Sequence, residues 1–307
     1  RQRQMCIRDR LDAVLYAPDN TPGNKTLFSK SVARTLLAKI YAEKPLRDYT
    51  KVIQYCDEVK EDGFDLVDDF SDLFGMNAAG TDAKMRNTKE SILEAQFTSG
   101  AGNWCTWMFG RDLVNWNNNF TWAKWVTPSR DLISAFKQEG DEVRFKESIV
   151  YYDCNWSNYY PSDNYPFMYK CRSANSSIIK YRYADVLLLK AEALIMQDTP
   201  DLEGAADIID EVRDRAKLGA LPTSVRSNKN VLLNALLKER RLELAFEGQR
   251  WFDLVRLDKV EEVMNAVYAK DSGRKAQIYT FDKNSYRLPI PQSVIDANDK
   301  IHQNPGY

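Results

Sequence analysis

Histidine is almost absent from the 307 residues, since His302 is the only one. A histidine-based catalytic triad, or a metal site with several histidine ligands, is therefore excluded in practice. No two cysteines have the CxxC spacing of a zinc site, and no glycine-rich phosphate loop of the form GxxxxGK[ST] or GxGxxG occurs. We therefore expect no metal ion and no cofactor.

Long apolar runs and surplus charge are also missing. No stretch of 18 apolar residues occurs, so no segment is predicted to cross a membrane as a helix. The formal net charge of −1 gives no general attraction to phosphate backbones, which disfavours nucleic acid as a partner. The apolar fraction of 44% and the charged fraction of 28% predict an ordinary globular chain.

The cysteine count is odd, so at least one of the five is left without an intramolecular disulfide partner. A bridge between Cys154 and Cys171 is one option that the sequence leaves open. The full set is Cys6, Cys56, Cys105, Cys154 and Cys171.

The first ten residues, RQRQMCIRDR, have neither helical periodicity nor the apolar centre of a signal peptide. We interpret residues 1–10 as a segment foreign to the domain, in which case the true N-terminus is missing. The predicted organisation then continues with a helical pair, an irregular aromatic-rich insertion, and a C-terminal helical region with a tail that wraps over the surface. These three parts cover residues 11–63, 64–175 and 176–307.

Two amphipathic helices are predicted in the helical pair. Over residues 27–41 the apolar positions recur at i, i+3, i+4 and i+7, and Ser29 or Ser31 is a suitable N-cap. Pro45 is expected to begin the second helix, and Gly63 to end it. Two helices of this length joined by a short loop predict a tetratricopeptide-like hairpin.

The insertion shows much less periodicity. Only Arg130–Lys137, preceded by Pro128 and Ser129, predicts a helix there. The segments 90–97 and 146–152 are compatible with short strands or with irregular structure. A long aperiodic segment inside a compact domain is typically functional or disordered, and the abundant tryptophan argues against disorder.

Regular helices are predicted again in the C-terminal region. Apolar stripes at helical spacing indicate four helices, followed by a tail rich in proline and asparagine. The predicted helices are 181–196, 202–217, 230–246 and 250–267, and the tail is 288–307.

Several C-terminal segments resemble the SusD-like (RagB/SusD) family of Bacteroidetes nutrient-binding lipoproteins. Their order and approximate spacing also agree with that family, whereas the insertion is similar to it only loosely, in NTKESILEAQF and PSRDLISAF. The similar segments are YRYADVLLLKAEAL from Tyr181, VRDRA from Val212, LLKERRLELAFEGQRWFDLVRL from Leu236, LPIPQSVIDAN from Leu288 and QNPGY from Gln303.

The resemblance implies an all-α fold of tetratricopeptide-like hairpins with a large irregular ligand-binding insertion. It also implies a binding protein rather than an enzyme, one that captures oligosaccharide or glycan nutrients at the cell surface. The implied partner is a TonB-dependent outer-membrane transporter of the SusC type. Membrane attachment in the family is through an N-terminal lipidated cysteine, and Cys6 lacks the preceding apolar stretch expected of that site.

Aromatic residues are the strongest functional signal, at 7 Trp, 16 Tyr and 13 Phe. Flat aromatic faces accept the C–H surfaces of sugars, while neighbouring amides bind the hydroxyl groups. Five tryptophans and several asparagines lie between residues 99 and 129, and a similar mixture follows near residue 160. Some of these rings are also expected to form a small core beneath the insertion. The predicted ligand-binding residues are Trp104, Trp107, Trp116, Asn117, Trp122, Trp156 and Tyr160.

The segment ERRLELAFEGQRWFDLVR has the densest charge pattern. Glu243 and Glu247 are spaced so that they could serve as catalytic carboxylates, but a structural network of Arg–Glu pairs between packed helices explains the pattern better. Gly248 is expected at a sharp break, and Trp251 is interpreted as a core residue.

An acidic run precedes the insertion's first predicted strand. Its spacing differs from that of an EF-hand, and a solvated acidic loop is the preferred interpretation over a calcium site. The run consists of Asp65, Asp68, Asp69 and Asp72.

Two other functions remain open on the sequence. A tetratricopeptide-type scaffold could bind a peptide or protein, although such scaffolds use a concave helical groove rather than an aromatic insertion. A glycoside hydrolase would need two carboxylates beside a sugar cleft, for which Asp112 and Asp153 are candidates.

Overall fold

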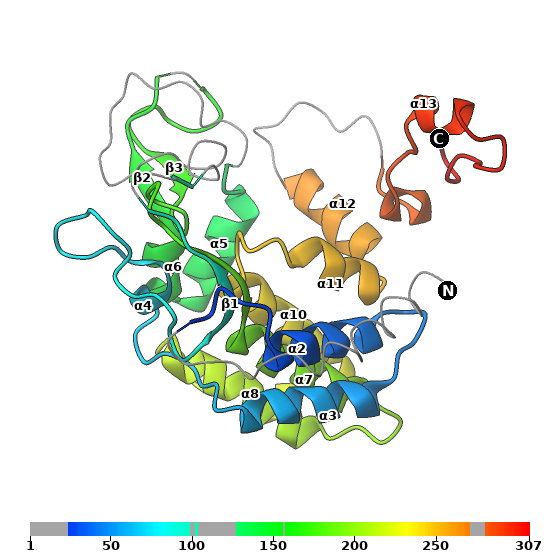
Figure 1. The fold of residues 1–307 in the computed structure, drawn as a ribbon, viewed down its shortest axis with the longest axis horizontal. Coiled ribbons are helices and arrows are strands. Elements are labelled where there is room, and N and C mark those ends of the chain that lie inside the picture. Colours follow the sequence, from blue (N-terminus) through cyan, green and yellow to red (C-terminus); the bar gives the residue numbers. More distant parts are fainter. Residues whose placement is uncertain (1–23, 99–101, 104–126, 156, 271–279) are drawn as a thin grey trace. The chain divides into compact units, whose positions relative to one another are not determined.

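The computed structural model describes residues 24–98, 102–103, 127–155, 157–270 and 280–307. The chain forms two compact units, Arg1–Gly248 and Gln249–Tyr307. The described structure is mostly helical, with two small two-stranded sheets in the first unit (Figure 1). The predicted all-α class is therefore confirmed, with the sheets as an addition.

The first unit begins with the predicted helical hairpin. Helix α2 (Lys30–Ala42) starts where Ser29 accepts a hydrogen bond from the backbone N–H of Val32, which confirms Ser29 as its N-cap. Helix α3 (Tyr49–Glu61) packs against α2. The expected start of α3 at Pro45 is wrong, because the carboxylate of Asp48 caps the helix and leaves Pro45 in the preceding turn.

Three longer helices complete the helical layer of the first unit. Helix α7 (Tyr183–Met196) packs against α3, α8 (Leu202–Arg215) and α10 (Lys229–Glu243), and the short α9 (Thr223–Arg226) lies between α8 and α10 in the chain. Helix α7 is buried on nearly all sides, because neighbours cover it from several directions. Figure 1 shows α2, α3, α7 and α8 side by side.

The core of this layer is aliphatic and closely packed. Small residues on α2, α7 and α8 bring the helix backbones close together, as the tetratricopeptide-like prediction requires. The fully buried members include Val32, Ala38, Val52, Leu188, Ala191, Ala205, Ile209 and Leu236.

Two antiparallel strand pairs lie outside this layer. Strand β1 (Ser91–Ala95) pairs with β4 (Ile178–Arg182), and β2 (Ile149–Tyr152) pairs with β3 (Tyr165–Met168). The strand option for residues 90–97 is confirmed. Residues 146–152 divide between the end of a helix and β2.

Three further helices belong to this part of the first unit. In the sequence, one precedes β1 and two lie between β1 and β2. Helix α4 (Ser71–Phe74) is a single turn, while α5 (Arg130–Glu139) begins after Ser129, as predicted, and ends at the left-handed Gly140. Helix α6 (Glu142–Ser148) follows and leads into β2. Leu132, Ile133 and Phe136 of α5 form a second small core.

The second unit contains α11 (Arg250–Arg256), α12 (Val260–Lys270), the 3₁₀ turn η2 (Lys283–Tyr286) and α13 (Gln292–Asp296). The prediction of one helix over residues 250–267 is wrong, because Asp258 adopts a left-handed φ of 56° and separates α11 from α12. Trp251 is only half-buried, and the centroid of its ring lies 6.4 Å from that of Phe281. The interpretation of Trp251 as a core residue is therefore only partly correct.

Two further sequence-based expectations concern cysteine and membrane spans. Cys154 and Cys171 do not form a disulfide with each other. Cys154 packs with Tyr165 and Phe167, whereas the sulfur of Cys171 accepts a hydrogen bond from Asn103 at 3.2 Å. Within the described ranges, every helix is too short or too polar to cross a bilayer.

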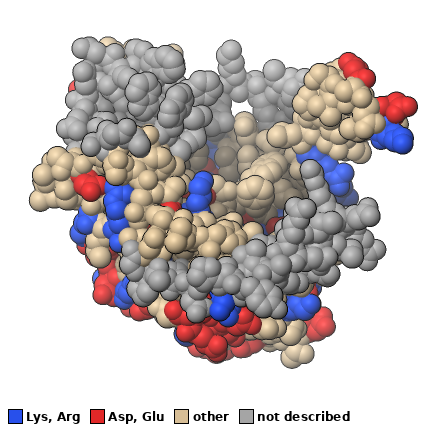
Figure 2. Space-filling model, viewed as in Figure 1, with Lys and Arg blue, Asp and Glu red and all other residues tan. Residues whose placement is uncertain are grey.

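Acidic side chains gather on the part of the first unit occupied by α3 and α8, which lies at the bottom of the view in Figure 2.

The predicted acidic run forms ion pairs with two lysines: Asp65 and Asp68 with Lys89, and Asp69 and Asp72 with Lys84. This outcome agrees with a solvated acidic loop.

Candidate ligand-binding site

An open hollow of about 780 Å³ lies between the start of α5 and the loop of residues 155–162. A second hollow of about 470 Å³ extends along α5. Arg130, Tyr160 and Pro161 line both of them, so the two adjoin. We call them together the α5 hollows.

The wall of the α5 hollows combines rings with short polar side chains. Tyr159 and Tyr160 supply the rings, and the loop adds amide and hydroxyl groups. Along α5 the wall continues with a hydroxyl, an ammonium and an amide group. These polar contributors are Asn155, Ser157, Asn158 and Ser162 on the loop, and Ser134, Lys137 and Gln138 on α5.

The guanidinium of Arg130 stacks over both tyrosine rings, 4.2 Å from the centroid of Tyr159 and 4.6 Å from that of Tyr160. It also donates a hydrogen bond to the backbone carbonyl of Tyr159. Cation–π contacts of this kind hold a guanidinium plane in a fixed orientation against a ring. Arg130 therefore connects the start of α5 to the loop and positions both tyrosine rings.

Further contacts fix the loop against the rest of the first unit. The hydroxyl of Tyr160 donates to the carbonyl of Pro128 at 2.7 Å, and that of Tyr165 contacts Ser157 at 3.2 Å. The Tyr160 ring meets those of Tyr159 and Tyr165 edge to face, at 4.9 and 5.6 Å. The rings that border the hollows are thus held in place before any ligand arrives.

The predicted ligand-binding residues fall largely outside the described part of the chain. Tyr160 is described and lies at the centre of the α5 hollows. Arg130 and Tyr159 are additional members of this wall. Arg130 could not be predicted from the sequence, because its position in the wall depends on the tertiary contact between the loop and the start of α5. The predicted residues outside the described ranges are Trp104, Trp107, Trp116, Asn117, Trp122 and Trp156.

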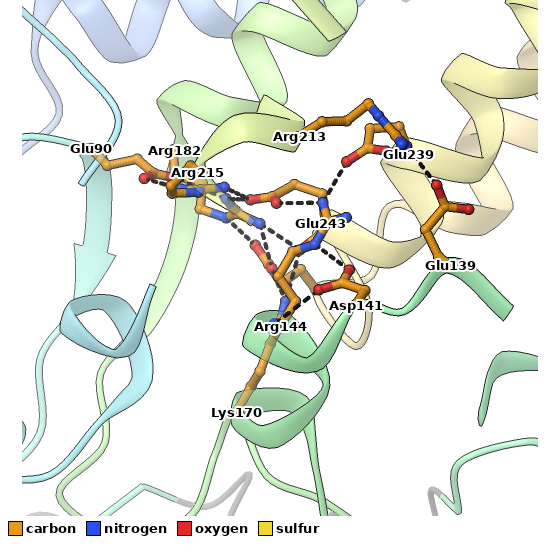
Figure 3. A network of polar contacts seen from close by, with 11 residues as sticks. Glu90, Glu139, Asp141, Arg144, Lys170, Arg182, Arg213, Arg215, Glu239 and Glu243 are labelled. Carbon is orange, nitrogen blue, oxygen red and sulfur yellow. Dashed lines mark hydrogen bonds and ion pairs between the residues drawn. The ribbon is translucent and has the colours of Figure 1, made fainter. Parts of the chain in front are cut away.

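A buried network of charged residues is the second prominent polar feature (Figure 3). At its centre, the carboxylate of Glu243 on α10 accepts hydrogen bonds from Arg144, Arg182 and Arg215. Glu90 bridges Arg182 and Arg215 at 2.7 and 2.6 Å. The network therefore links α6, β4, α8 and α10 with the segment just before β1.

Two neighbouring carboxylates, one on α10 and one just after it, are engaged in the same way. Glu239 pairs with Arg144 at 2.5 Å and with Arg213 at 3.3 Å. Glu247 pairs with Arg182 at 2.7 Å and with Lys170 at 2.5 Å. The predicted structural Arg–Glu network is confirmed.

Electrostatic effects in this network oppose one another. Burial alone would raise the pKa of Glu243, but the positive charges of Arg215, Arg182 and Arg144 hold that pKa well below its ordinary value. For Lys170 burial prevails and lowers the pKa to about 8, against the opposing charge of Glu247. Glu243 and Glu247 are thus ionised, enclosed and bonded to cations, which suits a structural role and not proton transfer to a substrate.

Among the described residues, no three His, Cys, Asp or Glu side chains are grouped so that they could hold a metal ion. The chemistry available at the α5 hollows is therefore that of aromatic contact, hydrogen bonding and positive charge.

The first unit thus combines a helical scaffold with an irregular segment whose tyrosines and short polar side chains line the α5 hollows. Residues 164–307 match the model of the SusD family. The C-terminal part of the chain is therefore similar to the SusD family.

Two curated relatives come from Formosa agariphila. The chain is 43% identical to "SusD-like protein P38" over 99 residues, which are 30% of this chain and 19% of that protein. It is 36% identical to "SusD-like protein P2" over 143 residues, which are 44% of this chain and 27% of that protein. The chain thus spans less than a third of the length of the curated relatives that it matches.

Solved structures of SusD-like proteins share the fold. One is surface glycan-binding protein A from Bacteroides thetaiotaomicron in complex with laminarihexaose, with a TM-score of 0.75 and 19% identity. The likeness covers 98% of this chain and 70% of that one. At this level of identity, the likeness establishes a common architecture.

Proposed function

We propose that this protein binds oligosaccharide or glycan nutrients at the cell surface and delivers them to a TonB-dependent transporter of the SusC type. The observation that carries the proposal is the wall of the α5 hollows, in which Tyr159 and Tyr160 stand beside loop amides and hydroxyls. The match of residues 164–307 to the SusD family model and the solved relative bound to laminarihexaose support it.

The proposed recognition needs no chemical step. Ring faces exclude water from the apolar face of a sugar, while amide and hydroxyl groups exchange hydrogen bonds with its hydroxyls. Preordered rings reduce the entropy that would otherwise be lost on binding. We therefore propose a binding protein rather than an enzyme.

The proposed location is the outer membrane, facing the cell exterior, with attachment through a lipid anchor in the whole protein. The similarity of residues 164–307 to the SusD family supports this location and the transporter partnership. The other predicted ligand contacts remain proposals alongside Tyr160, namely Trp104, Trp107, Trp116, Asn117, Trp122 and Trp156.

The test is isothermal titration calorimetry of the chain against a panel of soluble polysaccharides, including laminarin. The variants are Tyr159→Ala and Tyr160→Ala, with Tyr307→Ala as a matched tyrosine control in the second unit. Circular dichroism establishes that each variant is folded. We expect saturable binding of at least one glycan, weakened about tenfold or more by either loop variant and unchanged by the control.

Binding that is equal in all three variants would move the ligand site away from the α5 hollows. Absence of binding across the panel, by a folded protein, would contradict glycan capture.

A further inference from the structure

We propose that the α5 hollows take an acidic glycan, one whose sugar rings carry carboxylate or sulfate-ester groups. This inference rests on the proposed function, because it names the class of glycan for the same site. The observation behind it is the charge of the wall. Among the described residues that line the hollows, two are cationic and none is an aspartate or glutamate.

The two cations lie on one side of α5. Arg130 is the first residue of the helix and Lys137 lies seven positions later, which is close to two full turns. Residues at this spacing share a helix face, and their backbones are separated by about 10 Å along the axis. The wall therefore presents positive charge at two points along its length, which suits a polymer with repeated anionic groups.

The acidic residues of α5 are engaged with other elements. Asp131 pairs with Arg241 of α10 at 2.7 Å, and Glu139 pairs with Arg213 of α8 at 2.7 Å and with Lys238 of α10. Because cations from α8 and α10 offset these carboxylates, they do not cancel the positive charge of the wall.

The connection between β2 and β3 contains two acidic residues, Asp153 and Asp163, of which Asp153 is exposed and lines neither hollow. Asp163 is exposed and does not line either hollow, although its neighbours Ser162 and Asn164 do. Carboxylates in the wall would accept hydrogen bonds from sugar hydroxyls but would repel an anionic ligand. This wall offers amides, hydroxyls and cations in their place, which matches a ligand that carries its own negative charge.

Arg130 is held in a defined orientation. Its guanidinium stacks on Tyr159 and Tyr160 and donates to the Tyr159 carbonyl, so its plane is set by the folded loop. Planar guanidinium groups recognise carboxylate and sulfate oxyanions through charge-assisted hydrogen bonds. Lys137 is exposed and supplies a more mobile point charge.

The test compares charged and neutral forms of the same polymer, using the whole chain and affinity electrophoresis with calorimetry. Polygalacturonate and its methyl ester test the carboxylate, and dextran sulfate and dextran test the sulfate ester. We expect at least one anionic polymer to bind about tenfold or more tightly than its neutral counterpart. We also expect that preference to shrink as the salt concentration rises.

Three variants locate the charge dependence. Lys137→Gln removes one cation of the wall, Arg130→Lys keeps the charge but loses the stacked fork, and Lys146→Gln removes an exposed cation of α6 outside the hollows. Lys137→Gln and Arg130→Lys should each weaken binding of the anionic polymer by about threefold to tenfold, while binding after Lys146→Gln stays unchanged.

The outcomes separate this inference from the proposed function. Equal binding of neutral and anionic forms would overturn the acidic-glycan inference and leave glycan capture intact. Equal loss in all three variants would indicate general attraction to a polyanion and would also overturn it. Absence of binding to these polymers and to the laminarin panel would overturn both.

Discussion

Arg182 and Glu243 lie 61 positions apart in the sequence and form an ion pair of 2.5 Å, with side chains that are 1% and 0% exposed. The pair fixes the end of strand β4 to the end of helix α10. Since neither partner contacts bulk water, each depends on the other for its solvation.

Replacement of Glu243 by Gln should therefore destabilise the first unit strongly. The change leaves Arg144, Arg182 and Arg215 without their shared anion, and loss of one partner of a buried ion pair costs about 3–5 kcal/mol. Urea unfolding monitored by circular dichroism measures the effect. The exposed Glu61→Gln serves as the control, with an expected change below about 0.5 kcal/mol. Similar unfolding midpoints for the two variants would contradict a structural role of the network.

Asp185 should make the stability of the protein depend on acid pH. Burial alone would raise the pKa of Asp185, but the charges of Lys39 and Arg240, at 2.5 and 2.8 Å, hold it well below its ordinary value. A carboxylate with a depressed folded pKa stabilises the protein above its unfolded pKa of about 3.9, and that contribution is lost as pH falls toward the folded pKa.

The free energy of unfolding of the wild type should therefore exceed that of Asp185→Asn at neutral pH, and this difference should shrink below about pH 4. Chemical unfolding at several pH values measures it, with the exposed Asp198→Asn as the control. A difference that does not change with pH would show that the charge of Asp185 contributes little.

Lys170 should add a second pH dependence, in the alkaline range. Burial lowers its pKa to about 8, while its amino group donates to the Glu243 carbonyl at 2.9 Å and to the Glu247 carboxylate. Between about pH 8 and 10.5 the unfolded chain then binds more protons at this group than the folded chain does, so the Lys170 contribution to stability rises with pH. Comparison with Lys170→Met isolates this contribution, and the exposed Lys146→Met serves as the control. A difference that falls with pH in this window would mean that the ion pair with Glu247 prevails over burial.

Two leucines provide a direct test of the core assignment. Leu188 is fully buried in α7, whereas Leu288 in the second unit is 83% exposed. Leu188→Ala should cost about 2–5 kcal/mol, because it removes apolar contacts and leaves a cavity. Leu288→Ala should change stability by less than about 0.5 kcal/mol. Thermal or urea unfolding of the two variants measures these losses of stability. Equal losses for Leu188→Ala and Leu288→Ala would contradict the core assignment.

The helices could be predicted from the sequence because their apolar stripes repeat at helical spacing over several turns. The ends of the helices were harder to predict from the sequence, because each depends on a single residue. Asp48 caps α3 three residues after Pro45, and Asp258 breaks the last predicted helix by adopting a left-handed backbone conformation. An aspartate can also occupy many other positions, so the sequence pattern alone does not identify Asp48 as a helix cap or Asp258 as a helix break.

Of the buried ion network, the carboxylates could be predicted from the sequence, but their arginine partners could not. The carboxylates of α10 follow one another at helical spacing, which indicated a charged stripe. Their partners lie as far away as Arg144, which is 99 positions from Glu243. Such pairings depend on the tertiary fold. The same reason explains why Arg130 had no functional signal, whereas Tyr160 was predicted from the local mixture of aromatic and amide residues.

The pairing of β1 with β4 has a consequence for how this architecture can diversify. Ala95 lies opposite Ile178, so the whole intervening segment, α5 hollows included, leaves the helical layer and returns to it at one place. A segment closed at its base can be exchanged or lengthened at a modest cost, since each doubling of a flexible loop adds only about 0.6 kcal/mol of closure entropy. The segment that carries the α5 hollows could therefore be replaced through its two strand ends, by evolution or by engineering, without redesign of the helices that support it.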